Sequence, residues 1–175
     1  GAAVTLKAWA AQQRGEMCPA VGAYPGKDTL LAELKSELDA TGTPRPTAIV
    51  IGALGRVGTG ATDLMTEMGM AVTRWDMAET ASGGPFPEIL EHDIFINCIL
   101  AGPQTPVFVP REAKTGARKL TAIGDVACDP DSDYNPVPVY NKATTWAEPA
   151  LRVADAPVLD VMAIDNLPSL LPLES

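Results

Sequence analysis

Four glycines, at positions 52, 55, 58 and 60, are the residues whose spacing most strongly indicates chemistry. They fall between an apolar run and a helical stretch in the pattern G-x-x-G-x-x-G, one residue looser than the usual dinucleotide fingerprint. There Gly52 permits a tight turn, Gly55 lets the backbone approach a pyrophosphate, and Gly58 lets the helix pack closely on the strand. Unpaired N–H groups at the helix start attract a diphosphate, and Arg56 adds a charged contact.

A carboxylate follows the next apolar run at a spacing that also fits a dinucleotide. Asp76 closes the run 71–75 and lies 24 residues after Gly52. A carboxylate there accepts hydrogen bonds from the adenosine ribose and repels a 2′-phosphate, which favours NAD over NADP. No Gly-Lys-Ser or Gly-Lys-Thr follows the glycines, so a P-loop is excluded. The alternative interpretation is that the glycines only form a tight strand-to-helix turn.

Alternating apolar and helical segments around this loop predict the fold class. A continuous apolar run such as 48–51, followed by glycines, is typical of a strand buried on both faces of a parallel sheet. Further strands are predicted at 71–75, 93–99 and 120–125, with candidates at 137–140 and 158–164. Helices are predicted at 2–14, 28–40, 56–69 and, as a short turn, 87–91. This alternation indicates an α/β, Rossmann-type doubly wound fold with a mainly parallel sheet and helices on both faces.

A change of pattern near Pro44 divides the chain into two parts. We expect residues 1–43 to form an N-terminal helical segment of hinge or packing helices, and residues 44–175 to form a Rossmann NAD-binding domain. Asp28 is expected to cap the second helix, and 77–87 are expected to form a loop. The sequence opens without Met and stops just after an apolar run, so we interpret it as a fragment of a longer chain.

Charge and composition restrict the partners of the chain. It has 175 residues and a formal net charge of −9. We expect neither nucleic acid nor an anionic membrane as a partner, because both need clustered Lys and Arg, and no apolar run reaches the roughly 18 residues of a membrane span. Three widely spaced cysteines, Cys18, Cys98 and Cys128, form neither a disulfide framework nor a zinc-site pattern. Reduced thiols in a cytoplasmic protein are the expectation.

Two other groups of residues carry weaker signals. Asp125 closes the run 120–125, where open α/β sheets place ligand-facing residues, and is a candidate for the cleft. The stretch 129–133, Asp-Pro-Asp-Ser-Asp, lacks the Gly and the final Glu of a calcium loop, so we expect a solvated acidic loop and no metal. The only histidine, His92, is expected to be a solvated surface residue.

Five motifs, taken in their order along the chain, resemble the fungal-type family of NAD-dependent, lysine-forming saccharopine dehydrogenases. They are GALGR at 52–56, RWD at 74–76, GGPF at 83–86, DIFINCI at 93–99 and IDNLPSLLP at 164–172. The resemblance covers nearly the whole chain and relates its fold to alanine dehydrogenase and the transhydrogenase NAD domain. It implies two Rossmann-like domains with the active site between them, and this chain resembles the second, NAD-binding domain.

The resemblance also implies an activity. The family oxidises saccharopine with NAD to an imine, which hydrolyses to lysine and 2-oxoglutarate in the α-aminoadipate route of lysine biosynthesis. Its catalytic Lys and His belong to the first domain, which this chain lacks. We therefore expect the chain to bind NAD, to meet saccharopine, lysine and 2-oxoglutarate only with the missing domain, and to contain no catalytic residue. The alternatives are an alanine-dehydrogenase-like NAD enzyme and a non-catalytic Rossmann binding module.

By the same resemblance, binding roles fall on residues of this chain. Gly55 and Arg56 meet the pyrophosphate, and Asp76 holds the adenosine ribose with Thr80 nearby. The resemblance places Leu100 and Val126 along the cofactor cleft and Ala127 near the substrate. The residues it places by the nicotinamide end are Ile164, Asp165, Asn166 and Leu167. Val57 replaces a cysteine that some relatives carry within reach of the position of Cys98, so no redox role is assigned to Cys98.

Overall fold

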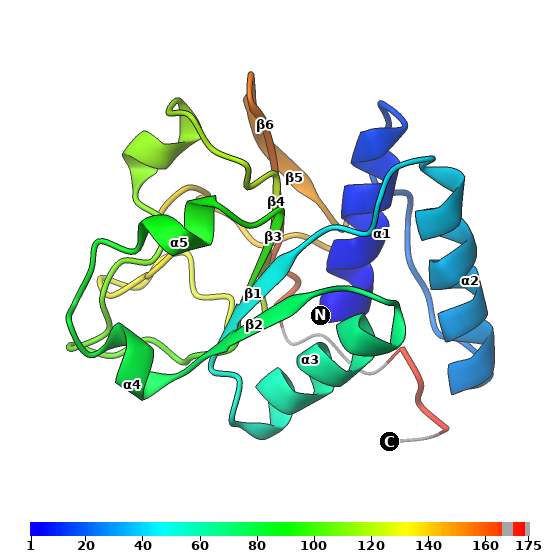
Figure 1. Cartoon of the computed structure of the whole chain (residues 1–175), viewed down its shortest axis with the longest axis horizontal. Helices are drawn as coiled ribbons and strands as arrows, with labels where there is room; N and C mark the ends of the chain where they lie inside the picture. The colour runs from blue at the N-terminus through cyan, green and yellow to red at the C-terminus, as the bar shows by residue number, and fades with distance from the viewer. Residues whose placement is uncertain (166–169, 174–175) are drawn as a thin grey trace.

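Short apolar runs form the strands at the centre of the fold. The computed structural model describes residues 1–165 and 170–173. The strands are β1 Ala48–Ile51, β2 Val72–Trp75, β3 Ile94–Asn97, β4 Ala122–Asp125, β5 Leu151–Asp155 and β6 Val158–Met162. They form one sheet in the order β2-β1-β3-β4-β6-β5, and only β5 runs antiparallel to its neighbour (Figure 1). β1, β3 and β4 are buried along their whole length, which confirms the predicted mainly parallel sheet.

Three longer helices cover one face of this sheet (Figure 1). They are α1 (Ala2–Gln13), α2 (Lys27–Ala40) and α3 (Arg56–Glu67). Leu30, Leu34 and Leu38 recur every fourth residue along α2, and this spacing turns all three toward the core. They join one hydrophobic cluster with Val50 of β1 and Ile96 of β3.

Short helices and long loops cover the opposite face. These helices are α4 (Met77–Thr80), α5 (Pro87–Leu90) and the 3-10 helix η1 (Arg111–Lys114). Successive side chains of a strand point to opposite faces, so Ile49 and Phe95 belong to this second core while their neighbours belong to the first. Phe108 packs edge-on against Phe95, with 6.0 Å between the ring centroids. The prediction of helices on both faces is confirmed.

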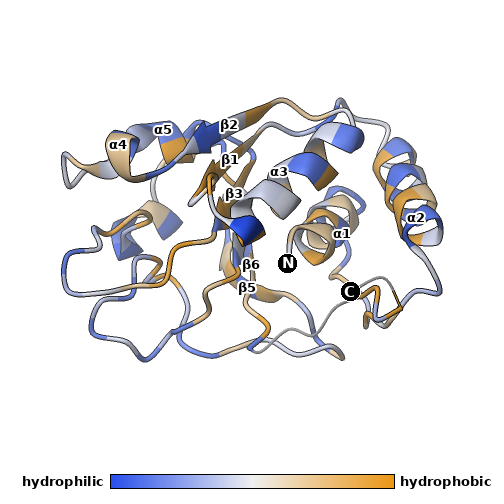
Figure 2. Cartoon of the chain, turned by 90° about the horizontal axis from the view of Figure 1, so that it is seen from below, coloured by the Kyte–Doolittle hydropathy of each residue, from blue (hydrophilic) through white to orange (hydrophobic). Residues whose placement is uncertain are grey.

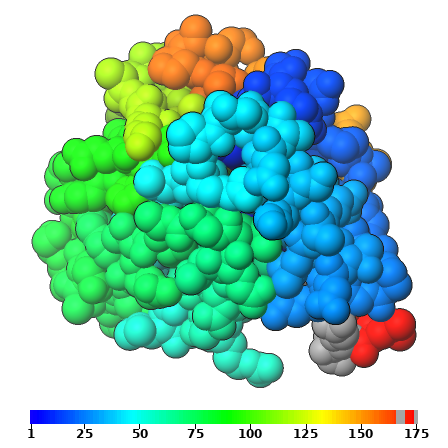
Figure 3. All heavy atoms as spheres, turned by 45° about the vertical axis from the view of Figure 1, so that its right-hand side comes forward, coloured from blue at the N-terminus to red at the C-terminus, as the bar shows by residue number. Residues whose placement is uncertain are grey.

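α1 is rich in alanine, has hardly any polar face and is buried along nearly its whole length. Figure 2 shows α1 between α2, α3 and the sheet, and in Figure 3 the light-blue α2 hides most of it. Its long polar side chains are paired. Lys7 Nζ lies 2.6 Å from Glu37 Oε1 of α2, and Gln12 donates to the buried carboxylate of Asp160 in β6. Arg152 of β5 holds the same carboxylate at 2.9 and 3.0 Å, so α1 is tied to the edge of the sheet.

Some elements differ from the sequence prediction. Residues 137–140 form turns instead of a strand, because Pro136 and Pro138 lack the N–H groups that a ladder needs. α4 begins inside the stretch predicted as a loop, and β5 and η1 were not predicted. α2 starts at Lys27 with Gly26 as its N-cap, so Asp28 lies in the first turn and does not cap the helix. No helix in the described ranges is long and apolar enough to cross a membrane.

Candidate functional site: the crevice at the carboxyl edge of the sheet

The order of the strands creates a crevice at one edge of the sheet. From β1 the chain goes outward to β2 and then returns to β3 on the other side of β1. The register aligns Ile51 with Trp75 on one side and with Asn97 on the other. In parallel sheets, ligands bind at the carboxyl edge where the winding reverses. β4 continues this alignment, because Asp125 lies opposite Asn97. The residues that follow the ends of these four strands are therefore neighbours at this edge: Gly52, Asp76, Cys98 and Val126.

Two glycines of the loop are required by close packing. Gly52 has φ +89°, and a Cβ on it would lie 2.9 Å from the carbonyl carbon and oxygen of Cys98. A Cβ on Gly58 would overlap the carbonyl oxygen of Gly52 and lie 2.7 Å from the Cα of Ala53. Gly58 therefore lets α3 pack against the turn, as its spacing predicts.

The start of α3 is open. Its N-cap is Gly55, which offers no side-chain acceptor, and no acidic residue lies in the first turn. A Cβ on Gly55 would have 3.7 Å to its nearest neighbour, and its φ of −77° suits any residue. Arg56 is exposed at the first helical position, and Leu54 and Val57 are exposed on either side of this start. The N–H groups of this turn and the Arg56 guanidinium form a positive corner in an acidic chain.

Asp76 lies directly beside this corner. It is half-buried and follows the end of β2. Its Oδ2 accepts a hydrogen bond from the backbone N–H of Leu54 at 3.0 Å, and its Oδ1 accepts one from the N–H of Met77 at 2.9 Å. Glu79 completes a capping box by accepting from the N–H of Asp76 at 2.8 Å. The carboxylate is thus held in place between the glycine loop and α4.

Two hollows contain predicted residues, one beside α4 and one beside α3. One, of about 640 Å³, lies between α4 and the segment after β3, and predicted residues Thr80 and Leu100 line it. Met77 and Leu100 are 78% and 83% exposed there, so its mouth is apolar and open. The other, of about 250 Å³, lies between α3, α2 and the start of α1, and predicted residue Val126 lines it together with Gly1, Leu30 and Val57.

The remaining predicted residues follow β4 and β6. Ala127 is half-buried, Ile164 is buried in a bridge with Thr144, and Asp165 is exposed. Asn166 and Leu167 lie outside the described residues.

Asp125 does not face the crevice, contrary to the prediction. It is 1% exposed, and its carboxylate accepts from Asn97 Nδ2 at 3.0 Å and from the Tyr140 hydroxyl at 2.7 Å. Burial raises the pKa of Asp125 above its usual value, and these two hydrogen bonds offset only part of the rise. Burial, together with the adjacent carboxylate, raises the pKa of Tyr140 far above its usual value. Asn97 and Tyr140 were not among the residues predicted from the sequence. An Asn at the end of an apolar central strand is, however, a recognisable signal in the sequence.

His92 also differs from the prediction. It is half-buried, and its Nδ1 lies 2.7 Å from the Glu88 carbonyl oxygen, which can only accept. Nδ1 therefore carries a proton, and Nε2 pairs with the Thr73 hydroxyl at 2.9 Å. Its role is structural. Within the described residues, no cluster of three His, Cys, Asp or Glu side chains is placed to hold a metal ion.

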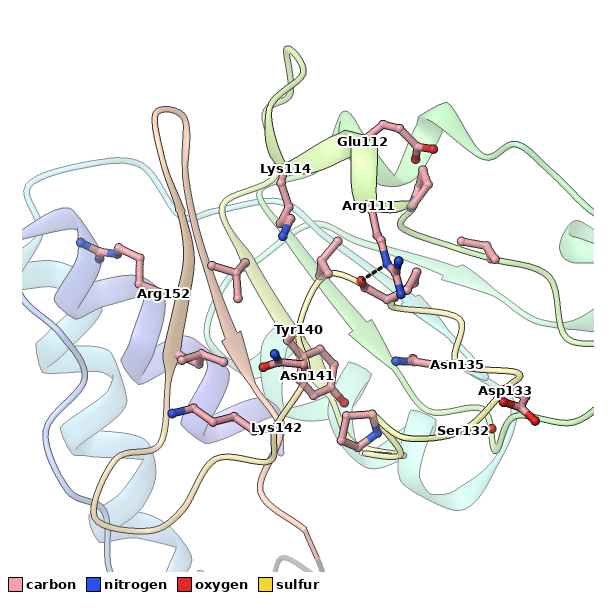
Figure 4. A pocket seen from close by; sticks show the side chains of 17 residues that line it. Arg111, Glu112, Lys114, Ser132, Asp133, Asn135, Tyr140, Asn141, Lys142 and Arg152 are labelled. Carbon is pink, nitrogen blue, oxygen red and sulfur yellow. Dashed lines mark hydrogen bonds between the residues drawn. The ribbon is translucent and has the colours of Figure 1, made fainter.

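A wider hollow lies away from the glycine loop. It has about 930 Å³ and opens between η1, β5 and the loop before β5 (Figure 4). None of the predicted cofactor residues within the described ranges lines it. Its charged side chains have both signs: Arg111, Lys114, Lys142 and Arg152 against Glu112 and Asp133.

Comparison with known proteins tests the resemblance seen in the motifs. No protein-family model matches the chain. A Yarrowia lipolytica protein named as an NAD-dependent, L-lysine-forming saccharopine dehydrogenase is 45% identical over the whole chain. Proteins of the same name from Candida albicans and Schizosaccharomyces pombe are 42% and 39% identical over the whole chain. Over its whole length, the chain resembles the saccharopine dehydrogenase family.

The resemblance concerns about half of each saccharopine dehydrogenase. The chain covers 51% of the Yarrowia protein, 52% of the Candida protein and 51% of the Schizosaccharomyces protein. The predicted resemblance to this family is therefore confirmed, over about half of the length of its members. The stretch 142–157, whose match was least clear in the motifs, lies within the matched region.

Proposed function

We propose that this chain binds NAD across the crevice at the carboxyl edge. The diphosphate lies at the start of α3, the adenosine ribose lies at Asp76, and the nicotinamide lies toward Val126. One observation carries this proposal: the Leu54 N–H, in the turn that opens α3, donates to the Asp76 carboxylate at 3.0 Å. A group that binds anions and a group that binds sugar hydroxyls are thereby adjacent, at the spacing that a nucleoside diphosphate requires.

Gly55 supports the placement of the diphosphate. Close packing explains Gly52 and Gly58, but the protein itself leaves room for a side chain at Gly55. A glycine there keeps the start of α3 open to a ligand. Arg56 then adds a charge-assisted contact from the same turn.

The hollows beside α4 and α3 receive the two ends of the dinucleotide in this proposal. Thr80 and Leu100 line the hollow next to Asp76, which suits the adenosine. Val126 lines the hollow beside α3, toward the nicotinamide. By family resemblance, the other contacts are proposed at Ala127 for the substrate and, for the nicotinamide end, at Ile164, Asp165, Asn166 and Leu167.

The proposed parent activity is the NAD-dependent oxidation of saccharopine to lysine and 2-oxoglutarate, in lysine biosynthesis. The names of the relatives support it and favour it over an alanine-dehydrogenase-like enzyme. When bound, NAD accepts the hydride, and the residues of this chain hold and orient it. The family's catalytic Lys and His belong to the other half of the protein, so we propose that this chain is inactive alone. The three free cysteines support the cytoplasm as its location.

Calorimetry with the purified chain tests the binding. We expect NAD to bind and NADP to bind more weakly, because the Asp76 carboxylate repels a 2′-phosphate. Asp76→Ala lowers NAD affinity about tenfold, on the order of one charged hydrogen bond. Asp63→Ala, on the exposed side of α3, is the matched control and leaves affinity unchanged. An unaltered dissociation constant for Asp76→Ala contradicts the proposed ribose site.

The inactivity of the isolated chain is tested separately. Saccharopine and NAD are mixed with the pure chain, and NADH is followed by its absorbance. We expect no NADH above a protein-free control. Sustained NADH formation that rises with the amount of chain contradicts the absence of a catalytic group.

A further inference from the structure

The buried hydrogen-bond network around Asp125 has no part in the binding contacts proposed above. Its members come from three places: Asn97 ends β3, Asp125 ends β4, and Tyr140 lies in the long loop between β4 and β5. Each carboxylate oxygen accepts one side-chain hydrogen bond, at 3.0 Å from Asn97 and 2.7 Å from Tyr140. The ionised carboxylate is the form that accepts at both oxygens.

On one side, the network reaches the adenosine wall of the crevice. Asn97 Oδ1 accepts from the backbone N–H of Ile99 at 3.1 Å, while its Nδ2 donates to Asp125. Both ends of the amide are therefore engaged, and the amide cannot flip without losing both bonds. Ile99 and Leu100 line the hollow next to Asp76.

On the other side, the network reaches the wall formed by Val126 and Ala127. The Val126 N–H donates to the Asn97 carbonyl at 3.0 Å, and the Cys128 N–H donates to the Asp125 carbonyl at 3.2 Å. This tight turn brings Cys128 to φ +28°, in the left-handed region. Tyr140 lies further along the same loop, and it lines the hollow drawn in Figure 4.

We propose that Asp125 is a positioning residue that sets the Val126–Ala127 wall of the crevice against the Ile99–Leu100 wall, through Asn97 and Tyr140. This inference rests on the proposed NAD site and adds to it. A buried carboxylate is expensive to keep, and an apolar side chain of similar size would serve packing equally well. A fully satisfied buried network fixes one arrangement of the elements it joins.

The experiment compares NAD with ADP, which carries the adenosine and diphosphate but no nicotinamide. In Asp125→Asn one of the two acceptor oxygens becomes an NH2 donor, so either Asn97 Nδ2 or the Tyr140 hydroxyl loses its acceptor. Tyr140→Phe removes that hydroxyl and keeps the ring. We expect both variants to lose about tenfold in NAD affinity, the size of a charged hydrogen bond, and to keep ADP affinity within about twofold. Asp63→Asn, exposed on α3, is the control and changes neither.

The outcomes separate the two proposals. If the unaltered chain binds ADP and NAD, and folded variants bind both as well as it does, the positioning proposal is wrong and the NAD site stands. An equal loss of ADP and NAD affinity also overturns the positioning proposal, because a general structural defect acts on both ligands. If the unaltered chain binds neither ligand, both proposals are wrong. Tyr140→Phe removes one atom, so it remains informative if Asp125→Asn does not fold.

Discussion

The two sides of the crevice are built by different means. On the side of β2, the glycine loop and Asp76 lie in short motifs, and backbone N–H groups make the decisive contacts. On the side of β4, a long loop is held by side chains, through Asp125 and Tyr140. A backbone site needs glycines at fixed positions, whereas a side-chain network needs partners that are distant in the sequence. We therefore expect substitutions that add atoms to disturb the side of β2, and substitutions that remove atoms to disturb the side of β4.

The largest effect is expected from an added methyl group at Gly58. Gly58→Ala places a Cβ onto the Gly52 carbonyl oxygen, so the turn or α3 must move. We expect a loss of about 3 kcal/mol in the free energy of unfolding, as for other overpacked sites. Urea denaturation measures it. Gly60→Ala is the control in the same helix, because a Cβ there has no neighbour within 4 Å. It is expected to stabilise by about 0.5–1 kcal/mol.

Thiol reactivity compares the two sides directly. Burial raises the pKa of Cys98, after β3, and of Cys128, after β4, from 9.0 to about 11. Well below pH 9 the thiolate fraction of each is then about a hundredfold smaller than at the ordinary pKa. We expect slow alkylation at pH 8 that rises about tenfold per pH unit up to about 11. Chains that retain one cysteine each, the others replaced by Ser, separate the two rates. The chain in denaturant is the control, and equal rates there and in the folded chain at pH 8 contradict the prediction.

Removal of one hydroxyl tests the side-chain network for stability. Tyr140→Phe leaves Asp125 Oδ2 without its 2.7 Å donor. We expect the free energy of unfolding to fall by about 1–2 kcal/mol, the cost of an unsatisfied buried acceptor. Tyr134→Phe, at an exposed tyrosine on the same loop, is the matched control. Equal stability of the two variants contradicts a network that orders this loop.

The smallest effect is expected at the capping box of α4. Glu79→Ala removes the acceptor of the Asp76 N–H, which lies at 2.8 Å, and keeps the Asp76 carboxylate itself. We expect a loss of about 0.5–1 kcal/mol, typical of a helix cap, and a two- to fivefold weaker affinity for NAD. Glu91→Ala, another exposed acid, is the control for the lost charge. An unchanged affinity shows that the first turn of α4 does not hold Asp76 for its ligand.

The sequence predicts the first side of the crevice well, because its information is local. The apolar run before Gly52 predicts β1, and the acid after the next run predicts the place of Asp76. The start of α4 is equally local, because Asp76 and Glu79 form a capping-box pattern in the sequence. The open corner at α3 follows from Gly55 and Arg56 with no tertiary contact required.

The second side is not predictable from local patterns in the same way. The run 137–140 resembles a strand, but its prolines leave it in turns that bury the side chains. β5 is a half-buried edge strand with only a weak alternation of polar and apolar residues. Asp125 was assigned to the cleft by its place at a strand end. Two residues earlier Ile123 belongs to the second core, and this alternation turns Asp125 toward Tyr140 instead.

The burial of α1 has a consequence for how the polypeptide acquires its structure. Gln12 and its partner Asp160 are 148 positions apart, so α1 packs against a strand that is synthesised long after it. Such contacts of high sequence separation slow folding, because a long stretch of chain has to be ordered before they form. α1, an alanine-rich helix with few polar groups, therefore stays undocked until β6 has been synthesised. We expect the docking of α1 on β6 to be a late step in folding. Until then, we expect chaperones to bind the exposed apolar surface of α1.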